Sequence, residues 1–255
     1  DNFGTSFAGK YESYFCPNQS NPKENLRALT TAIRRIYASV YSPDALFYRK
    51  RMGLLDYDER MAILLQEVQG DEYKHYFFPA LAGVALSRAP IVWNPRLRRD
   101  EGFVRLVNGL GTRAVNRVAD DYPRLLTLSH PTLRPETSPT AIKRYSQHYI
   151  DLINLDANEF ETKSLNDVMG MDYPPLRWLS SVDEDDTLMP MMSMGRNIPP
   201  QRLVMTFDNL IQRGDFVSTM KDTLTTLAHH YEAPVEMEFA ASITAQGARP
   251  SVTLH

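Results

Sequence analysis

The sequence predicts an α+β fold in which mixed or antiparallel sheets pack against helices. Two stretches, residues 22–40 and 216–231, repeat apolar side chains at helical spacing. Between and after them lie short apolar runs of strand length, separated by turn residues. With 43% hydrophobic residues, the 255-residue chain can bury a sizeable core, either in one large domain or in two small ones.

The composition narrows the class of function. The 28 basic and 31 acidic residues nearly balance, so we expect binding neither to nucleic acid nor to a membrane. No apolar run is long enough to span a bilayer. Cys16, the single cysteine, cannot form an internal disulfide, which favours a reducing, cytoplasmic location. The first residues resemble no signal or transit peptide and lack an initiator methionine, which suggests a piece of a longer protein.

The N-terminal third predicts two helices. Asn21 is a capping residue, and Pro22 suits the first turn of a helix. A second helix is expected to start at Ser42 and to stop near Gly53. The first helix should bury an apolar stripe, formed by Leu26, Leu29, Ile33, Ile36 and Val40.

Residues 61–70 form a continuous apolar run with a polar exit, which predicts a buried central strand. Such a strand could present its backbone, with Gln66 and Glu67, to the edge of a purine ring. A plain buried strand whose polar end reaches solvent explains the same pattern, so both interpretations stay open.

Further strands are expected over 77–87, 91–93, 103–107, 148–156 and 202–207. The third of these, over 103–107, runs into a Gly-x-Gly turn at 109–111, which could approach a ligand but is also common in ordinary turns. Asp215 is expected to cap the helix over 216–231. Three prolines within 131–139 mark the expected internal boundary, which would divide 1–130 from 140–255, and 174–200 is expected to be an irregular connection.

Two stretches carry candidate chemistry. Residues 1–13 are small and polar, and glycines such as Gly9 allow backbone amides to cradle phosphate, although this stretch alone favours an ordinary turn between two strands. Residues 234–240 alternate apolar and acidic side chains, as a half-buried strand does. Glu236 and Glu238 would then lie side by side, about 6.6–7 Å apart. They could share Mg²⁺ and so hold nucleotide phosphates, or they could simply face solvent.

Taken together and in order, these stretches resemble the nucleotide-binding domain of phosphoenolpyruvate synthase and pyruvate phosphate dikinase, which has an ATP-grasp fold. Residues 6–13 are similar to the family's Ser-Phe-Ala-Gly-Gln-Gln-Glu-Thr phosphate loop. Residues 41–53 resemble the helix after that loop, and 61–68 the strand that leads to the adenine. The Gly-Leu-Gly turn at 109–111 and the acidic strand at 234–239 also match.

The resemblance implies two ligands, ATP and Mg²⁺. It assigns nucleotide binding to Gly9, Lys10, Glu12, Ser13, Gln66, Glu67 and Val68. It assigns the metal to Glu236 and Glu238. The parent protein would transfer phosphate from ATP to a histidine on a phosphohistidine domain, and then to pyruvate on a pyruvate-binding domain. A homodimer is compatible with this reading.

The departures from the family pattern imply an incomplete ATP-grasp domain over 1–255. Lys10 and Tyr11 replace glutamines, and Thr112 replaces an acid. The family's lysine and Arg-Ser-Ser segment would precede Asp1, and its Gln-x-Arg would follow His255. The phosphohistidine motif is absent. We therefore expect this chain alone to be inactive, and the alternative is a non-catalytic, regulatory module of the same fold.

Overall fold

The computed structural model describes residues 10–116, 120–191, 197–246 and 249–255. The chain divides into two compact units. The first unit comprises Asp1–Val68 and Ile153–Phe160, and the second comprises Gln69–Leu152 and Glu161–His255. Residues 131–139, the expected boundary, lie within the second unit, between a strand and a helix of that unit.

The first unit contains the two predicted helices, α1 (Pro22–Ser39) and α2 (Pro43–Arg51). Local capping explains their starts. The Asn21 side chain accepts hydrogen bonds from two backbone amides of the first turn of α1, and Ser42 accepts one from Ala45. The predicted stripe on α1 is buried only in part, because Leu26 is 61% exposed.

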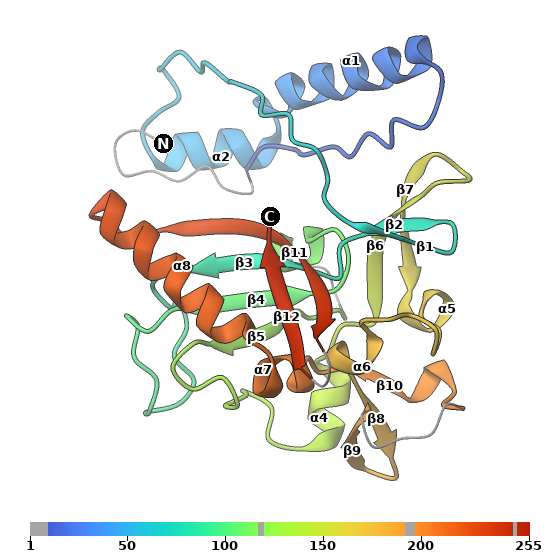
Figure 1. The fold of residues 1–255 in the computed structure, drawn as a ribbon. Helices are drawn as coiled ribbons and strands as arrows, with labels where there is room; N and C mark the ends of the chain where they lie inside the picture. The colour runs from blue at the N-terminus through green and yellow to red at the C-terminus, as the bar shows by residue number, and fades with distance from the viewer. Residues whose placement is uncertain (1–9, 117–119, 192–196, 247–248) are drawn as a thin grey trace. The chain divides into compact units, whose positions relative to one another are not determined.

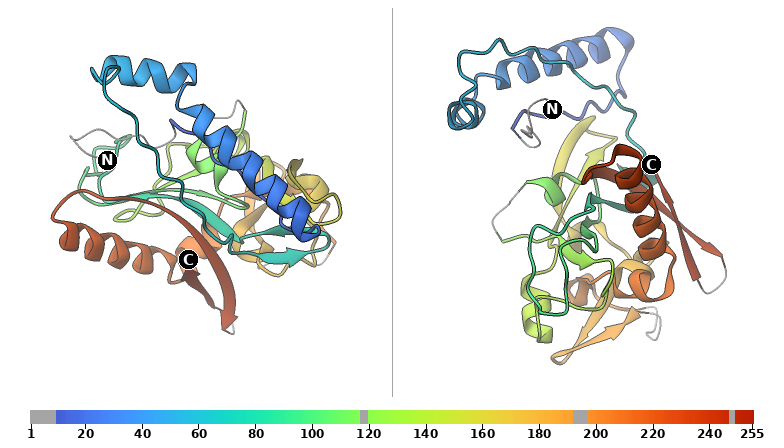
Figure 2. Two further views of the ribbon diagram at one scale, coloured as in Figure 1. Left: turned by 90° about the horizontal axis from the view of Figure 1, so that it is seen from above. Right: turned by 90° about the vertical axis from the view of Figure 1, so that its left-hand side faces the viewer.

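The second unit is built on a five-stranded antiparallel sheet with the order β12-β11-β3-β4-β5 (Figure 1). Its strands are β3 (Leu81–Leu86), β4 (Phe103–Val107), β5 (Arg124–Thr127), β11 (Glu236–Gln246) and β12 (Arg249–Leu254). Helix α8 (Phe216–Tyr231) runs along one face of this sheet (Figure 2). The predicted strand over 103–107 and the predicted helix over 216–231 are therefore confirmed, and the strand predicted over 234–240 is present but begins at Glu236.

The main core of the second unit lies on the face that α8 covers. The rings of Phe216 on α8 and Phe239 on β11 are 6.1 Å apart, and both are buried. Asp215 stands at the start of α8 but makes no capping hydrogen bond with its side chain. Its carboxylate instead accepts hydrogen bonds from Ser251 Oγ and the backbone N of Val252, at 2.8 and 2.9 Å, and so ties α8 to β12.

Two smaller sheets complete the second unit. One has the order β1-β2-β6-β7, and the other has the order β10-β8-β9. Their strands are β1 (Asp71–Tyr73), β2 (Tyr76–Phe78), β6 (Tyr149–Asn154), β7 (Glu159–Ser164), β8 (Ser180–Glu184), β9 (Thr187–Pro190) and β10 (Leu203–Met205). The short helices are α3 (Thr112–Val115), α4 (Pro139–Arg144), α5 (Leu165–Val168), α6 (Leu176–Leu179), η2 (Pro200–Arg202) and α7 (Asp208–Arg213). The end of the β6–β7 hairpin belongs to the first unit.

The strand predicted over 61–70 is wrong. This segment forms neither helix nor strand, and Leu64 and Leu65 are 77% and 64% exposed. A strand exists only where a neighbouring strand accepts its hydrogen bonds, and an apolar run does not reveal that partner. The strand predicted over 91–93 is likewise a loop, in which Ile91 is 48% exposed.

The irregular connection predicted over 174–200 is also wrong. The segment contains α6 and the antiparallel β8–β9 hairpin. Asp185 and Asp186 form its turn with φ angles of 45° and 66°. Positive φ at both central residues is the geometry of the tightest hairpin turns, and aspartate tolerates it. The single strand expected over 77–87 is divided by Pro79 into β2 and β3.

Candidate functional site

The acidic strand β11 has the predicted alternation. Glu236 and Glu238 are exposed, whereas Met237 is half-buried and Phe239 is only 5% exposed. Successive strand residues point to opposite faces of the sheet, so the two carboxylates lie on the face opposite α8. The apolar side chains fix this orientation, because they fill the core beneath the helix.

Both carboxylates are available to a ligand. Their backbones pair with β3, but among the residues that the structure describes neither the Glu236 nor the Glu238 side chain has a hydrogen bond or an ion pair. The same part of the chain has no cluster of three or more His, Cys, Asp or Glu residues that could hold a metal ion. Mg²⁺ commonly binds through one or two carboxylates together with substrate phosphates. The pair therefore fits a magnesium ion that arrives with a phosphate ligand.

The strand register places other side chains on the same face. Glu238 pairs with Val84 on β3, and Val84 pairs with Arg105 on β4. Beside them lies a small apolar cluster, to which Val84, Val107 and Ala114 belong. Across this face, the two carboxylates are followed by apolar side chains and then by the guanidinium of Arg105. Arg105 belongs to no sequence motif, and its one distinguishing feature in the sequence is that it is a lone charge inside an otherwise apolar strand.

The Gly-Leu-Gly turn adopts a backbone that requires glycine. Gly109 and Gly111 have φ angles of 102° and 84°. A Cβ on Gly109 would lie 2.6 Å from Ile150 Cγ1, and the backbone N of Leu110 donates to the carbonyl of Asp151 at 3.0 Å. In the second unit, therefore, Gly109 lets the turn pack closely against β6, whereas Gly111 lies beside Ala82 on β3.

A buried ion network follows the turn, and the sequence analysis missed it. Arg113 forms ion pairs with Asp121 and Asp151, and the side chains of all three residues are at most 9% exposed. Asp151 also accepts hydrogen bonds from Thr112 and Thr162. Thr112, which departs from the family pattern, is thus part of this network. In the sequence, the feature that could have indicated this network is an aspartate, Asp151, within the otherwise apolar strand β6.

In the first unit, the residues after Gly9 are held against α1 and α2, and Gly9 itself lies outside the described residues. Lys10 Nζ stands 5.3 Å from the ring centre of Tyr48. The backbone N of Glu12 donates to Ser39 Oγ at 3.2 Å, and its carboxylate accepts from Tyr14 at 2.7 Å. Ser13 is exposed.

Tyr11 anchors this segment more firmly than its neighbours do. Its hydroxyl donates to Glu59 Oε1 at 2.7 Å, and Glu59 is also 3.5 Å from the buried Arg49. Burial, followed by the hydrogen bond to Glu59, raises the pKa of Tyr11 above its usual value. The raised pKa therefore keeps the hydroxyl protonated, and able to donate, to a higher pH than in an unperturbed tyrosine.

The predicted adenine-binding residues lie in the extended segment that precedes β1. Gln66 and Glu67 are exposed, and Val68 is half-buried. None of the three makes a backbone-to-backbone hydrogen bond with another described residue. Their backbone donors and acceptors are therefore open to a ligand, although they are not on a strand.

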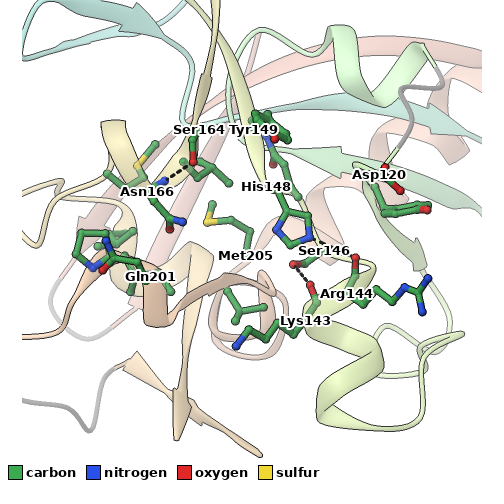
Figure 3. Close-up of a pocket in the computed structure, with 18 residues that line it drawn as sticks. Asp120, Lys143, Arg144, Ser146, His148, Tyr149, Ser164, Asn166, Gln201 and Met205 are labelled. Atoms are coloured by element: carbon green, nitrogen blue, oxygen red, sulfur yellow. Dashed lines mark hydrogen bonds between the residues drawn. The ribbon is translucent and has the colours of Figure 1, made fainter.

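A separate pocket of about 520 Å³ lies in the second unit (Figure 3). His148 and Lys143 lie on one side of it, Asn166 and Gln201 on the other, and Met205 between them. Lys143 forms an ion pair with Asp183. None of the residues expected to bind nucleotide or metal lines this pocket, and none of its lining residues belongs to the five-stranded sheet.

Comparison with protein families shows the family to which the chain belongs. Residues 1–250 match the model of the AMP/ATP-binding domain of pyruvate phosphate dikinase. The chain belongs to this family. This match confirms the resemblance that the sequence predicted, and the antiparallel sheets packed with helices agree with the ATP-grasp-like fold of the family. No curated protein sequence matches the chain. In the described part of this AMP/ATP-binding domain, no helix is long and apolar enough to cross a membrane.

Proposed function

We propose that this domain binds ATP together with Mg²⁺ as the nucleotide-binding part of a phosphotransferase. Phosphate would pass from ATP to a histidine on a phosphohistidine domain, and then to pyruvate on a pyruvate-binding domain. The observation that carries the proposal is the exposed pair of carboxylates on β11, which have no side-chain partner among the described residues, in a chain of the AMP/ATP-binding domain family. The single, free Cys16 supports a reducing, cytoplasmic location.

The residues have distinct roles in this proposal. Glu236 and Glu238 hold Mg²⁺, which neutralises the phosphate charge when it is bound. Backbone amides around Gly9, with Ser13, bind phosphate, and Lys10 and Glu12 are further nucleotide-binding residues. The open backbone of 66–68 binds the edge of the adenine, a role that needs free donors and acceptors and no strand.

The deciding experiment is calorimetric titration of Mg-ATP into the chain and into Glu238→Gln. Loss of a charged ligand typically costs about 1.5–3 kcal/mol, so we expect the substitution to weaken binding by about tenfold or more. Glu72→Gln is the matched control, because Glu72 is an exposed strand glutamate in β1, away from the five-stranded sheet. Equal Mg-ATP affinity in Glu238→Gln and Glu72→Gln would contradict the metal assignment.

Metal removal tests the same site without a mutation. If the carboxylates act through Mg²⁺, chelation should weaken ATP binding to the wild-type chain and to Glu72→Gln by about tenfold, but should change Glu238→Gln little. A wild-type chain that binds ATP equally with and without Mg²⁺ would instead hold the nucleotide by its own side chains and backbone.

A further inference from the structure

Arg105 occupies the middle of β4, on the sheet face that carries the acidic pair. The register runs from Glu238 to Val84 to Arg105, so two strand spacings, about 9.5 Å, separate the first and last of these residues. Residues paired in this way project from the same face of the sheet. Glu238 and Arg105 therefore flank Val84 on either side.

The half-buried Arg105 guanidinium has no counter-charge among the residues that the structure describes. The only hydrogen bond that its side chain makes with a described residue runs from Nη1 to the carbonyl of Ala114 at 3.4 Å. No carboxylate in the described part of the chain pairs with it. By contrast, the buried Arg113 has two carboxylates, and Arg134 has Asp208 at 2.7 Å. A partly buried charge without a counter-charge is unfavourable, unless a ligand supplies one.

We propose that Arg105 binds the phosphates of the nucleotide, so that this face recognises a nucleoside polyphosphate. The inference rests on the proposed function. Glu236 and Glu238 would take the magnesium end of the polyphosphate, and Arg105 would take phosphate oxygens on the far side of Val84. Arginine suits this role because its guanidinium donates two parallel hydrogen bonds to a phosphate.

Charge balance supports this assignment. Two carboxylates alone repel a polyphosphate, and a single Mg²⁺ does no more than cancel the charge of the carboxylate pair. A cation on the same face then gives the polyphosphate a net attraction. The effect depends on phosphate number, because a nucleoside monophosphate offers less charge and shorter reach. Arg105 should therefore matter for ATP and not for AMP.

The test compares Mg-ATP and AMP binding to the 255-residue chain and to three variants by calorimetric titration. We expect Arg105→Gln to weaken ATP binding about tenfold and to leave AMP binding unchanged. Arg105→Lys, which keeps the charge but loses the planar fork, should fall between Arg105→Gln and the wild type. Arg213→Gln is the control and should change neither affinity. Arg213 is an exposed arginine of α7, and its side chain has no hydrogen bond or ion pair with the described residues.

The outcomes separate this inference from the proposed function. If Glu238→Gln weakens ATP binding and Arg105→Gln does not, the phosphate role of Arg105 is wrong and the metal site stands. Equal losses of ATP and AMP in Arg105→Gln also overturn the inference, since they indicate a structural role. If Arg105→Gln does not fold, Arg105→Lys decides: wild-type ATP affinity in that variant rejects the role. A wild-type chain that binds no Mg-ATP rejects both proposals.

Discussion

Among individual residues, Arg113 is a buried charge in the second unit that depends on two carboxylate partners. Its guanidinium is buried between the carboxylates of Asp121 and Asp151, and Asp121 also accepts from the backbone N of His148. Breaking such a buried pair leaves an uncompensated charge, which costs more than the pair itself contributes. The network therefore fixes how β6, α3 and the loop before β5 fit together.

Asp151→Asn should lower the free energy of unfolding by about 3 kcal/mol, because it removes one of the two counter-charges of Arg113. Urea unfolding followed by circular dichroism measures this loss. Asp100→Asn is the matched control: Asp100 pairs with Arg98 at 3.0 Å, but both side chains are about 70% exposed, so the change should cost less than about 1 kcal/mol. A similar small loss for both variants would show that the buried network does not stabilise the fold.

Among the elements, the Gly109–Gly111 turn links the five-stranded sheet to β6. The turn leaves β4, packs its backbone against Ile150 and Asp151, and delivers the chain into α3. Helix α3 in turn contributes Ala114 to the apolar cluster beside Val84 and accepts the hydrogen bond of Arg105. The proposed phosphate-binding face is thus supported by a turn that is itself outside it.

Gly109→Ala should destabilise the domain by more than about 2 kcal/mol. Its backbone φ of 102° is unfavourable for alanine, and the added methyl group would collide with Ile150 and with the carbonyl of Asp151. Gly53→Ala provides the comparison, because Gly53 has a φ of 69° but nothing within 4 Å of its Cβ position. That variant should cost only about 1 kcal/mol, from the left-handed backbone alone. Equal melting temperatures for the two would refute the steric argument.

At the scale of the whole molecule, residues 58–70 connect the two compact units without regular secondary structure. Most of their side chains are exposed, and none of these residues makes a backbone-to-backbone hydrogen bond with another described residue, so the segment opens easily. The same features make it available to a nucleotide. Stability and binding at this point of the chain should therefore be coupled.

Limited proteolysis should first cut within this connection, after Arg60 with trypsin and after Leu64 or Leu65 with chymotrypsin. Mg-ATP should slow these cuts if 66–68 bind the adenine, since a ligand that favours the closed backbone reduces opening. Mass spectrometry of the fragments locates the sites. Cleavage that begins inside β3 or α8 would contradict the expected weakness of the connection, and unaltered cleavage with Mg-ATP would contradict the adenine assignment.

Sequence reasoning succeeded where the determining interactions are local. Asn21 and Ser42 cap their helices with neighbouring amides, and the alternation in β11 already separates core from solvent. It failed where the partner is distant. The apolar run at 61–70 does not reveal whether a neighbouring strand is present to pair with it. Arg105 becomes a candidate phosphate-binding residue only through its register with Glu238.

The period of β11 also constrains how this strand can evolve. Its side chains alternate between the core under α8 and the candidate magnesium face, so a shift of one position exchanges the two sets. An insertion or deletion of a single residue within 236–240 would place carboxylates in the core and an aromatic ring on the opposite face. Related genes should therefore differ here by substitution and keep the length of this segment.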